Sequence, residues 1–281
     1  MKKIIHFAAA AVLALLTTSC LEHSATIRLN KDGSGTIVEE TLFSAEASAM
    51  MAQMPAGDGQ DPLAQFADAK KAAAAAAKMG EGVTVEKAEK IDKDGRKGGR
   101  VTYKFKDINQ VKFAFGQAMS DAGKDMGPPG APGDAPDEGD DALPENKPIT
   151  FTYKDGTLTL VNPELKKEAK KPAAGKEGDA PDGAEEPDAQ AMAMMQGMFK
   201  DMRMALKIEI ADGIAETDAL HVKGDTVTLM DVAFGKLIAD PANMKKLSSM
   251  QDSTPAEMAA AFKDIEGMEI ETKEKVTVKV K

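Results

Sequence analysis

Cys20 is the one cysteine of the 281-residue chain. Before it come a basic start with Lys2 and Lys3, an apolar run over residues 4–16 and a short polar stretch over 17–19. This order is that of a secretory signal, with Cys20 as the first residue of the mature chain. The apolar run has about 13 residues, and a membrane-spanning helix needs ~20. A lone thiol in an exported protein is reactive, or pairs between molecules, unless it is modified.

The segment Leu16-Thr17-Thr18-Ser19-Cys20 resembles the lipobox of bacterial lipoproteins, with Thr17 where Leu, Val or Ile is usual. The resemblance implies that residues 1–19 are a signal peptide and that a diacylglyceryl group is attached to the Cys20 sulfur. Two acyl chains anchor a protein stably where one is marginal. Leu21 replaces the Asp that tends to keep enteric lipoproteins in the inner membrane, which favours the outer membrane of the cell envelope. The alternative is an ordinary secretory signal that ends near a cysteine.

The mature chain is strongly acidic. Loss of Lys2 and Lys3 reduces the 36 basic residues to 34, against 46 acidic ones, so the net charge becomes −12. Such a surface repels nucleic acid and anionic headgroups over about 8 Å at physiological ionic strength. We therefore predict no nucleic-acid partner, and we expect the lipid on Cys20 to hold the protein on its membrane.

Residues for catalysis are scarce, because the mature chain has two histidines and no free thiol once Cys20 is acylated. His23 lies three residues from Cys20, so we expect it near the membrane, and we expect His221 to be an ordinary surface or strand residue. Glu39 and Glu40 are neighbours in a predicted strand, where successive side chains point to opposite faces. The sequence contains no Gly-x-Ser-x-Gly nucleophile elbow. We predict that the protein is not an enzyme and holds no cofactor.

Metal sites are also poorly supported. Zinc sites use clusters of cysteine and histidine, which the sequence lacks. The segment Asp32-Gly33-Ser34-Gly35 and the acidic loop over 134–141 offer oxygen ligands for calcium, but without the glutamate at position 12 of an EF-hand loop. We predict no metal site from these residues.

Methionine gives an ambiguous signal, because two segments predicted as helices are rich in it. They contain Met50, Met51 and Met54 and, in a helix from about 189 to 204, Met192, Met194, Met195, Met198, Met202 and Met204. Thioethers suit Cu(I), but methionine also fills cores or lines grooves for apolar partners. Met192, Met195, Phe199 and Met202 share one helical stripe, which favours packing. An apolar ligand in a Met-rich groove stays open as an alternative.

Three stretches share the order of strand pattern, Lys-Asp-Gly and second strand pattern, centred on Asp32-Gly33, Asp94-Gly95 and Asp155-Gly156. Alternating apolar residues predict half-buried strands, and Asp-Gly between them is typical of a hairpin turn. Three such hairpins with one polar face each indicate an antiparallel sheet covered on one side. Their nearly equal spacing fits either a duplicated unit or a common turn used three times.

Helices are expected between and after the hairpins. The capping residues are Ser44, Asp61 before Pro62, Asp107 with Gln110, Asp240 before Pro241, and Thr254 before Pro255. The Asp107 helix would include Val111, Phe115 and Met119. The chain would close in one strand from Met268 to Val280. The predicted fold is α+β, an antiparallel sheet with helices packed on one face.

Two stretches, about 120–148 and 163–188, are rich in Pro, Gly, Ala and charge and poor in the apolar residues that offset ordering entropy. We expect residues 20–281 to be a single domain interrupted by these two low-complexity insertions.

The layout resembles a loose group of bacterial lipoproteins that includes the mycobacterial LppM type. The likeness rests on the lipobox, the Asp32-Gly33-Ser34-Gly35 hairpin, the segment from Ile208 to Gly213 leading into Val227-Thr228-Leu229, and the closing strand with Val276 and Val278. The comparison of that fold with lipid-binding domains suggests apolar-ligand binding. We therefore expect a non-enzymatic, membrane-anchored lipoprotein with a structural, assembly or binding role and an envelope protein as possible partner. The alternative is a carrier of lipid or another apolar ligand.

Overall fold

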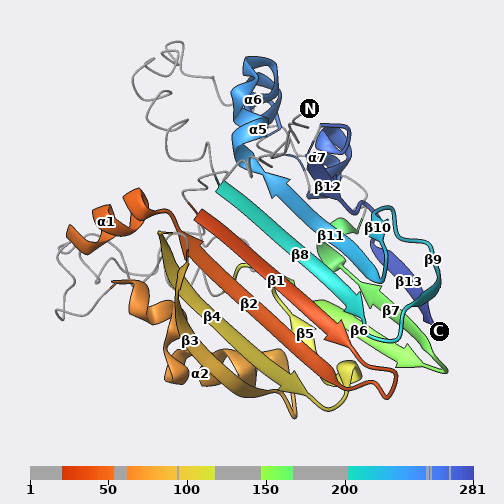
Figure 1. The fold of residues 1–281 in the computed structure, drawn as a ribbon. Helices are drawn as coiled ribbons and strands as arrows, with labels where there is room; N and C mark the ends of the chain where they lie inside the picture. Colours follow the sequence, from red (N-terminus) through yellow and green to blue (C-terminus); the bar gives the residue numbers. More distant parts are fainter. Residues whose placement is uncertain are drawn as a thin grey trace, which may run out of the picture.

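The computed structural model describes residues 21–53, 62–93, 95–117, 147–166, 202–250, 253, 255–265 and 267–281. Cys20, the predicted signal peptide and the methionines of 192–198 lie outside these ranges. Two sheets and a few short helices make up the described fold (Figure 1). The predicted α+β class is confirmed.

The larger sheet, called sheet A, has eight strands. Its spatial order is β10 (Val222–Lys223), β11 (Thr226–Ala233), β8 (Met202–Ile210), β1 (Leu21–Leu29), β2 (Gly35–Phe43), β4 (Arg96–Phe105) and β3 (Thr84–Lys93), and β12 (Met268–Ile270) also pairs with β11. β1 and β8 run parallel, so the prediction of a purely antiparallel sheet is wrong. Parallel neighbours need a long crossover between them, and here much of the chain separates the two strands.

The smaller sheet, called sheet B, contains the third predicted hairpin. Its order is β5 (Lys112–Phe113), β6 (Ile149–Lys154), β7 (Thr157–Val161), β13 (Lys275–Val280) and β9 (Ile214–Thr217). Figure 1 shows sheet B and α2 (Ala69–Met79) behind sheet A. Inward residues of both sheets and of α2 form one core, including Ile27, Ile208, Leu160 and Val278. The apolar face of sheet A is thus covered mainly by a second sheet, and the expected covering of helices alone is wrong.

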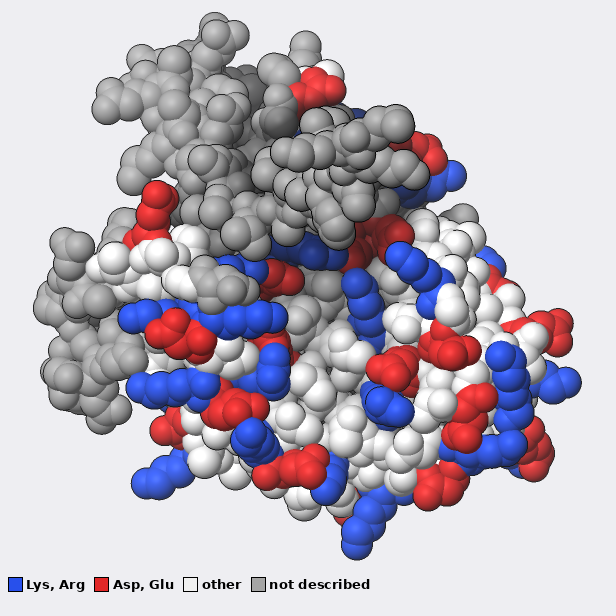
Figure 2. All heavy atoms as spheres, in the orientation of Figure 1, with Lys and Arg blue, Asp and Glu red and all other residues white. Residues whose placement is uncertain are grey.

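The opposite face of sheet A carries ion pairs. Arg28 Nη1 lies 3.3 Å from Glu209 Oε1 across the parallel strands. Figure 2 shows basic and acidic side chains interspersed over this face. Exposed pairs of this kind contribute little to stability, about 0–1 kcal/mol each, but they leave this face without a large patch of one charge.

The strands that flank each Lys-Asp-Gly segment are paired antiparallel: β1 with β2, β3 with β4, and β6 with β7. Gly33 and Gly156 have positive φ values of 86° and 73°, and Asp155 has φ 50°. Glycine adopts this region without a Cβ clash, and aspartate tolerates it better than most residues. Asp94 lies outside the described residues.

The remaining helices are short: α1 (Ala45–Gln53), α5 (Phe234–Ala239), α6 (Pro241–Ser248) and α7 (Pro255–Phe262), with 3-10 turns η1 (Pro62–Ala67), η2 (Ile108–Gln110) and η3 (Pro163–Leu165). Ser44 Oγ accepts from the Ala47 N–H at 3.1 Å, and Asp240 Oδ1 accepts from the Ala242 N–H at 2.8 Å. These contacts confirm both predicted caps. No helix of the described ranges has the length and hydrophobicity to cross a bilayer.

Three predicted elements differ from the structure. Asp107 caps only the short turn η2, and Phe113 then pairs with Ile149, so the expected helix does not form. Met202 and Met204 belong to β8, where they alternate along a strand instead of ending a helix. The expected C-terminal strand is divided between β12 of sheet A and β13 of sheet B, because the chain crosses between the sheets after Ile270.

The two predicted insertions fall largely outside the described residues, which omit 118–146 and 167–201. The second was expected to begin at Pro163. The structure instead has η3 at Pro163–Leu165, with Leu165 buried, and the chain is described through Lys166. Leu165 packs with Ala256 and Ala259 of α7, which explains why this part of the segment joins the fold.

Candidate functional site

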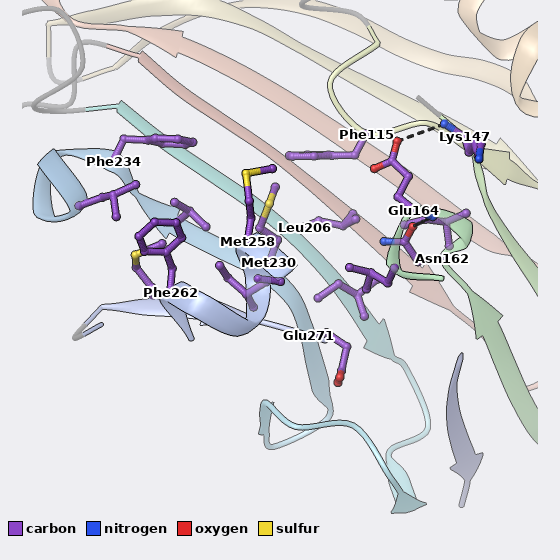
Figure 3. Close-up of a pocket in the computed structure, with 18 of the residues that line it drawn as sticks. Phe115, Lys147, Asn162, Glu164, Leu206, Met230, Phe234, Met258, Phe262 and Glu271 are labelled. Atoms are coloured by element: carbon purple, nitrogen blue, oxygen red, sulfur yellow. Dashed lines mark hydrogen bonds between the residues drawn. The ribbon is translucent and has the colours of Figure 1, made fainter. Parts of the chain in front are cut away.

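An apolar cavity of about 320 Å³ lies where sheets A and B meet helices α5–α7. Its lining comes from both sheets, all three helices and η3. It consists of Phe113, Phe115, Lys147, Ile149, Asn162, Glu164, Leu165, Leu206, Leu229, Met230, Val232, Phe234, Leu237, Leu247, Met258, Ala259, Phe262, Met268, Ile270 and Glu271. Figure 3 shows aromatic, aliphatic and thioether side chains around this space. Walls of this kind favour apolar ligands.

A β-bulge in β11 shapes one wall. Thr228 pairs with Lys207 and Met230 pairs with Leu206, so Leu229 is the extra residue between them. The Leu229 carbonyl accepts a hydrogen bond at 2.9 Å from the Glu271 N–H, just after β12. A bulge turns side chains away from the regular alternation. Here it lets both Leu229 and Met230 line the cavity.

Three thioethers line the cavity: Met230 of β11, Met258 of α7 and Met268 of β12. The unbranched methionine side chain adapts to differently shaped apolar neighbours. Of the methionines that the sequence suggested for a groove, Met54 and those in 192–198 lie outside the described residues, and Met202 and Met204 of β8 are not among the residues that line this cavity. The sequence did not indicate Met230, Met258 and Met268 as lining residues, because each is a single methionine in a different element.

The polar lining residues of the cavity include Lys147, Asn162 and Glu164. The Lys147 N–H donates to Glu164 Oε1 at 3.2 Å, drawn as a dashed line in Figure 3. The Glu164 N–H donates to Asn162 Oδ1 at 3.1 Å. In the view of Figure 3 these groups lie together at the side away from Phe234. Ligand sites commonly combine apolar walls with a few such polar groups, which orient the ligand.

Glu271 is almost completely buried, yet its carboxylate is well satisfied. Oε2 accepts from the Leu220 N–H at 2.8 Å, and Oε1 accepts from the N–H groups of Thr272 and Lys273 at 2.9 and 3.0 Å. Figure 3 shows its side chain directed away from the other lining residues. Glu271 therefore holds the crossover between the two sheets and leaves the apolar space free of its charge.

A second group of buried polar side chains lies on the inner face of sheet A. His23 Nδ1 is 2.9 Å from Thr41 Oγ1, and the ring stacks on Phe115 at a centroid distance of 5.0 Å. Within the described structure His23 Nε2 has no hydrogen-bond partner. Burial lowers the pKa of His23 to about 4, so the ring is neutral near pH 7. β1 turns His23 into the core, where its side chain is buried, and its expected closeness to the membrane stays a prediction.

Glu39 is the neighbouring buried acid. Burial raises the pKa of Glu39 to about 7, although a hydrogen bond from the Tyr103 hydroxyl opposes the shift. Burial also raises the pKa of Tyr103, and the Glu39 charge adds to this effect. Glu40 points outward, where Arg100 Nε donates to its Oε2 at 2.7 Å. The prediction that Glu39 and Glu40 face opposite ways is confirmed.

The other residues considered from the sequence have structural partners. Asp32 Oδ1 accepts from the Ser34 N–H at 2.9 Å and the Ser34 hydroxyl at 2.6 Å, which closes the turn. His221 Nε2 lies 3.2 Å from the Ile270 carbonyl oxygen. Among the described residues, no three His, Cys, Asp or Glu side chains are grouped so that they could hold a metal ion. The acidic loop over 134–141 lies outside the described ranges.

No family model matches this chain, and no curated protein matches it. A search of solved structures lists the NMR structure of the folded domain of LppM from Mycobacterium tuberculosis. The two chains share 10% sequence identity with a TM-score of 0.31, over 83% of this chain and 88% of that chain. LppM is of the group that the sequence pattern suggested. Because the likeness is weak in both measures, the function is inferred below from this chain's own residues.

Proposed function

We propose that the protein is a non-enzymatic lipoprotein of the bacterial cell envelope, anchored through Cys20, whose folded domain binds an apolar ligand such as an acyl chain. The binding role is carried by one observation, the apolar cavity between the two sheets and helices α5–α7. The outer membrane is the proposed location, on the basis of Leu21 after the lipidated cysteine.

The dimensions and chemistry of the cavity support this role. Its volume of about 320 Å³ falls at the lower end of the ~300–1,000 Å³ found for small-molecule sites. Its walls are mainly Leu, Ile, Val, Phe and Met side chains, which gain free energy when apolar surface of a ligand is removed from water, about 25 cal/mol per Å². Lys147 and Asn162 at the polar side would meet the more polar end of such a ligand.

The buried acids Glu271 and Glu39 have structural surroundings that do not involve a ligand in the cavity. Glu271 is saturated by three backbone N–H donors. Glu39 and His23 are not among the residues that line this cavity. The other titratable side chains among the described lining residues are Lys147 and Glu164, and Glu164 Oε1 accepts from the Lys147 N–H.

A fatty-acid titration tests the proposal. The Cys20→Ala chain, which needs no detergent, is titrated with the fluorescent fatty acid cis-parinaric acid. Ala259 of α7 is buried and lines the cavity, so Ala259→Phe fills the space. We expect at least about a tenfold loss of affinity, equal to about 1.4 kcal/mol.

Ala260→Phe is the matched control, because Ala260 is exposed on the same helix. This variant should bind cis-parinaric acid as the parent chain does. Equal affinity of the parent and Ala259→Phe chains, or no binding by either, would contradict the proposed binding role and leave an assembly role for the anchored domain.

A further inference from the structure

The sheet begins where the proposed lipid anchor ends. β1 starts at Leu21, the residue that follows Cys20, and Leu21 is already paired with Phe43 of β2 and Met202 of β8. Adjacent Cα atoms are 3.8 Å apart across a trans peptide. A lipid on Cys20 would thus be joined to the start of a central strand of the sheet with no flexible spacer. The peptide link between the proposed anchor and the sheet is thus a single residue long.

The entrance to α5 lies at the same end of sheet A. Next to Met202, Arg203 of β8 pairs with Ala233, the last residue of β11, and α5 begins at Phe234. Two strand spacings, about 10 Å in total, separate β1 from β11. Figure 1 shows α5 and α6 at the end of the sheet where β1 and β8 begin. Phe234, a lining residue of the cavity, is therefore close to the first residue after the anchor.

Two acids at this end, Glu22 and Asp231, form ion pairs. Arg96 Nη2 lies 2.8 Å from Glu22 Oε2, and Arg203 Nη2 lies 2.8 Å from Asp231 Oδ2. Lys207 Nζ adds a second cation 2.9 Å from the same Asp231 oxygen. Anionic headgroups repel unpaired carboxylates within about a Debye length. The pairing of Glu22 and Asp231 reduces that repulsion.

We propose that the end of sheet A formed by the start of β1, the start of β8 and the start of α5 rests on the lipid monolayer that carries the Cys20 anchor. The proposal depends on the proposed lipidation. It places Phe234, and with it one side of the apolar cavity, next to that monolayer. The apolar ligand would then be an acyl chain taken from the membrane surface. The β1–β2 turn, at the other end of the sheet, would point away from the membrane.

Single tryptophans test this orientation, because the chain contains none of its own. The lipidated full chain is reconstituted into vesicles whose phospholipids carry brominated acyl chains, which quench nearby tryptophan fluorescence. Phe234→Trp reports on the proposed contact. Tyr153→Trp is the matched control, since Tyr153 is also half-buried and its hydroxyl donates to the Lys31 carbonyl oxygen in the β1–β2 turn. That turn follows Leu29, about 26 Å along β1 from Leu21.

We expect brominated lipid to quench Phe234→Trp strongly and Tyr153→Trp weakly. Insertion of about 20 Gly and Ser residues between Cys20 and Leu21, with a root-mean-square span of about 25 Å, should remove the difference. Quenching of Phe234→Trp that survives the insertion would show that this end also holds the monolayer by its own contacts. Equal quenching of both tryptophans without the insertion would overturn the orientation. Failure of the chain to stay on the vesicles at all would instead contradict the anchor.

Discussion

His23 Nδ1 lies 2.9 Å from Thr41 Oγ1 inside sheet A, only three residues after Cys20. A histidine at this distance from a lipid anchor was expected at the membrane surface. The early start of β1 buries its ring in the core of the domain. Because β1 starts at Leu21, no flexible segment separates the proposed anchor from sheet A. The proposed orientation, with Phe234 and one side of the cavity next to the membrane, follows from this short link.

The buried Glu39 should make the domain less stable as the pH rises. Its pKa is raised to about 7 from an ordinary 4.5, so the folded state holds a proton that the unfolded state releases between these values. The resulting loss of unfolding free energy is on the order of 3 kcal/mol once the pH exceeds 7. We expect Glu39→Gln, which keeps a neutral amide beside Tyr103, to be more stable than the parent chain at pH 8 in urea denaturation. Equal unfolding free energies at pH 8 would contradict the raised pKa.

His23 should have the opposite effect. Its pKa is lowered to about 4 from an ordinary 6.5, so the unfolded state binds a proton first and stability falls as the pH drops from 6.5 to 4. His23→Gln should lack this decline, whatever its stability at pH 7. Unfolding free energies measured at pH 4.5, 5.5 and 6.5 check the slope, and a His23→Gln slope identical to that of the parent chain would count against the prediction.

The hydrogen bonds of the Glu271 carboxylate should contribute to the free energy of unfolding. Three backbone N–H groups depend on its carboxylate, and hydrogen bonds to charged groups contribute about 1.5–3 kcal/mol each. We expect Glu271→Gln to lower the free energy of unfolding by about 1–3 kcal/mol. The glutamine NH₂ group cannot accept a hydrogen bond, so the backbone N–H on its side loses its acceptor. Glu274→Gln, at an exposed position nearby, is the control and should change it little. Similar values for both variants in urea denaturation would show that Glu271 does not hold the crossover.

Cys20→Ala should move the protein from the membrane fraction to the soluble fraction. The acyl chains supply the attachment, and a mature chain with a net charge of −12 is not attracted to anionic headgroups. Fractionation of host cells followed by immunoblotting measures the distribution. A Cys20→Ala chain that stays with the membranes would show that the lipobox interpretation is wrong.

Local patterns predicted local structure well. Alternation at Ile27 and Leu29 indicated β1, and the caps Ser44 and Asp240 marked the starts of α1 and α6. Where the sequence pattern was ambiguous, tertiary pairing decided the outcome. Phe113 joined a strand because Ile149 was available as its partner.

Contacts between distant segments were not visible in the sequence. The parallel pairing of Leu21 with Met202 depends on residues far apart in the chain, and neither segment carries a signal for the other. The cavity likewise combines single residues such as Met230, Met258 and Met268 from separate elements. The alternation of Leu206, Ile208 and Ile210 indicated the second half of β8, but the run of methionines suggested a helix that included its start at Met202 and Met204.

Native mass spectrometry of the protein purified from its own host membranes tests the central proposal most directly. The parent chain and Ala259→Phe are compared under conditions that remove detergent but keep bound ligands. We expect the parent chain to carry a non-covalent lipid or fatty acid beyond the mass of the Cys20 anchor, and we expect Ala259→Phe to lack it. A parent chain that carries only its covalent anchor, or two chains that retain the same lipid equally, would contradict binding in the cavity.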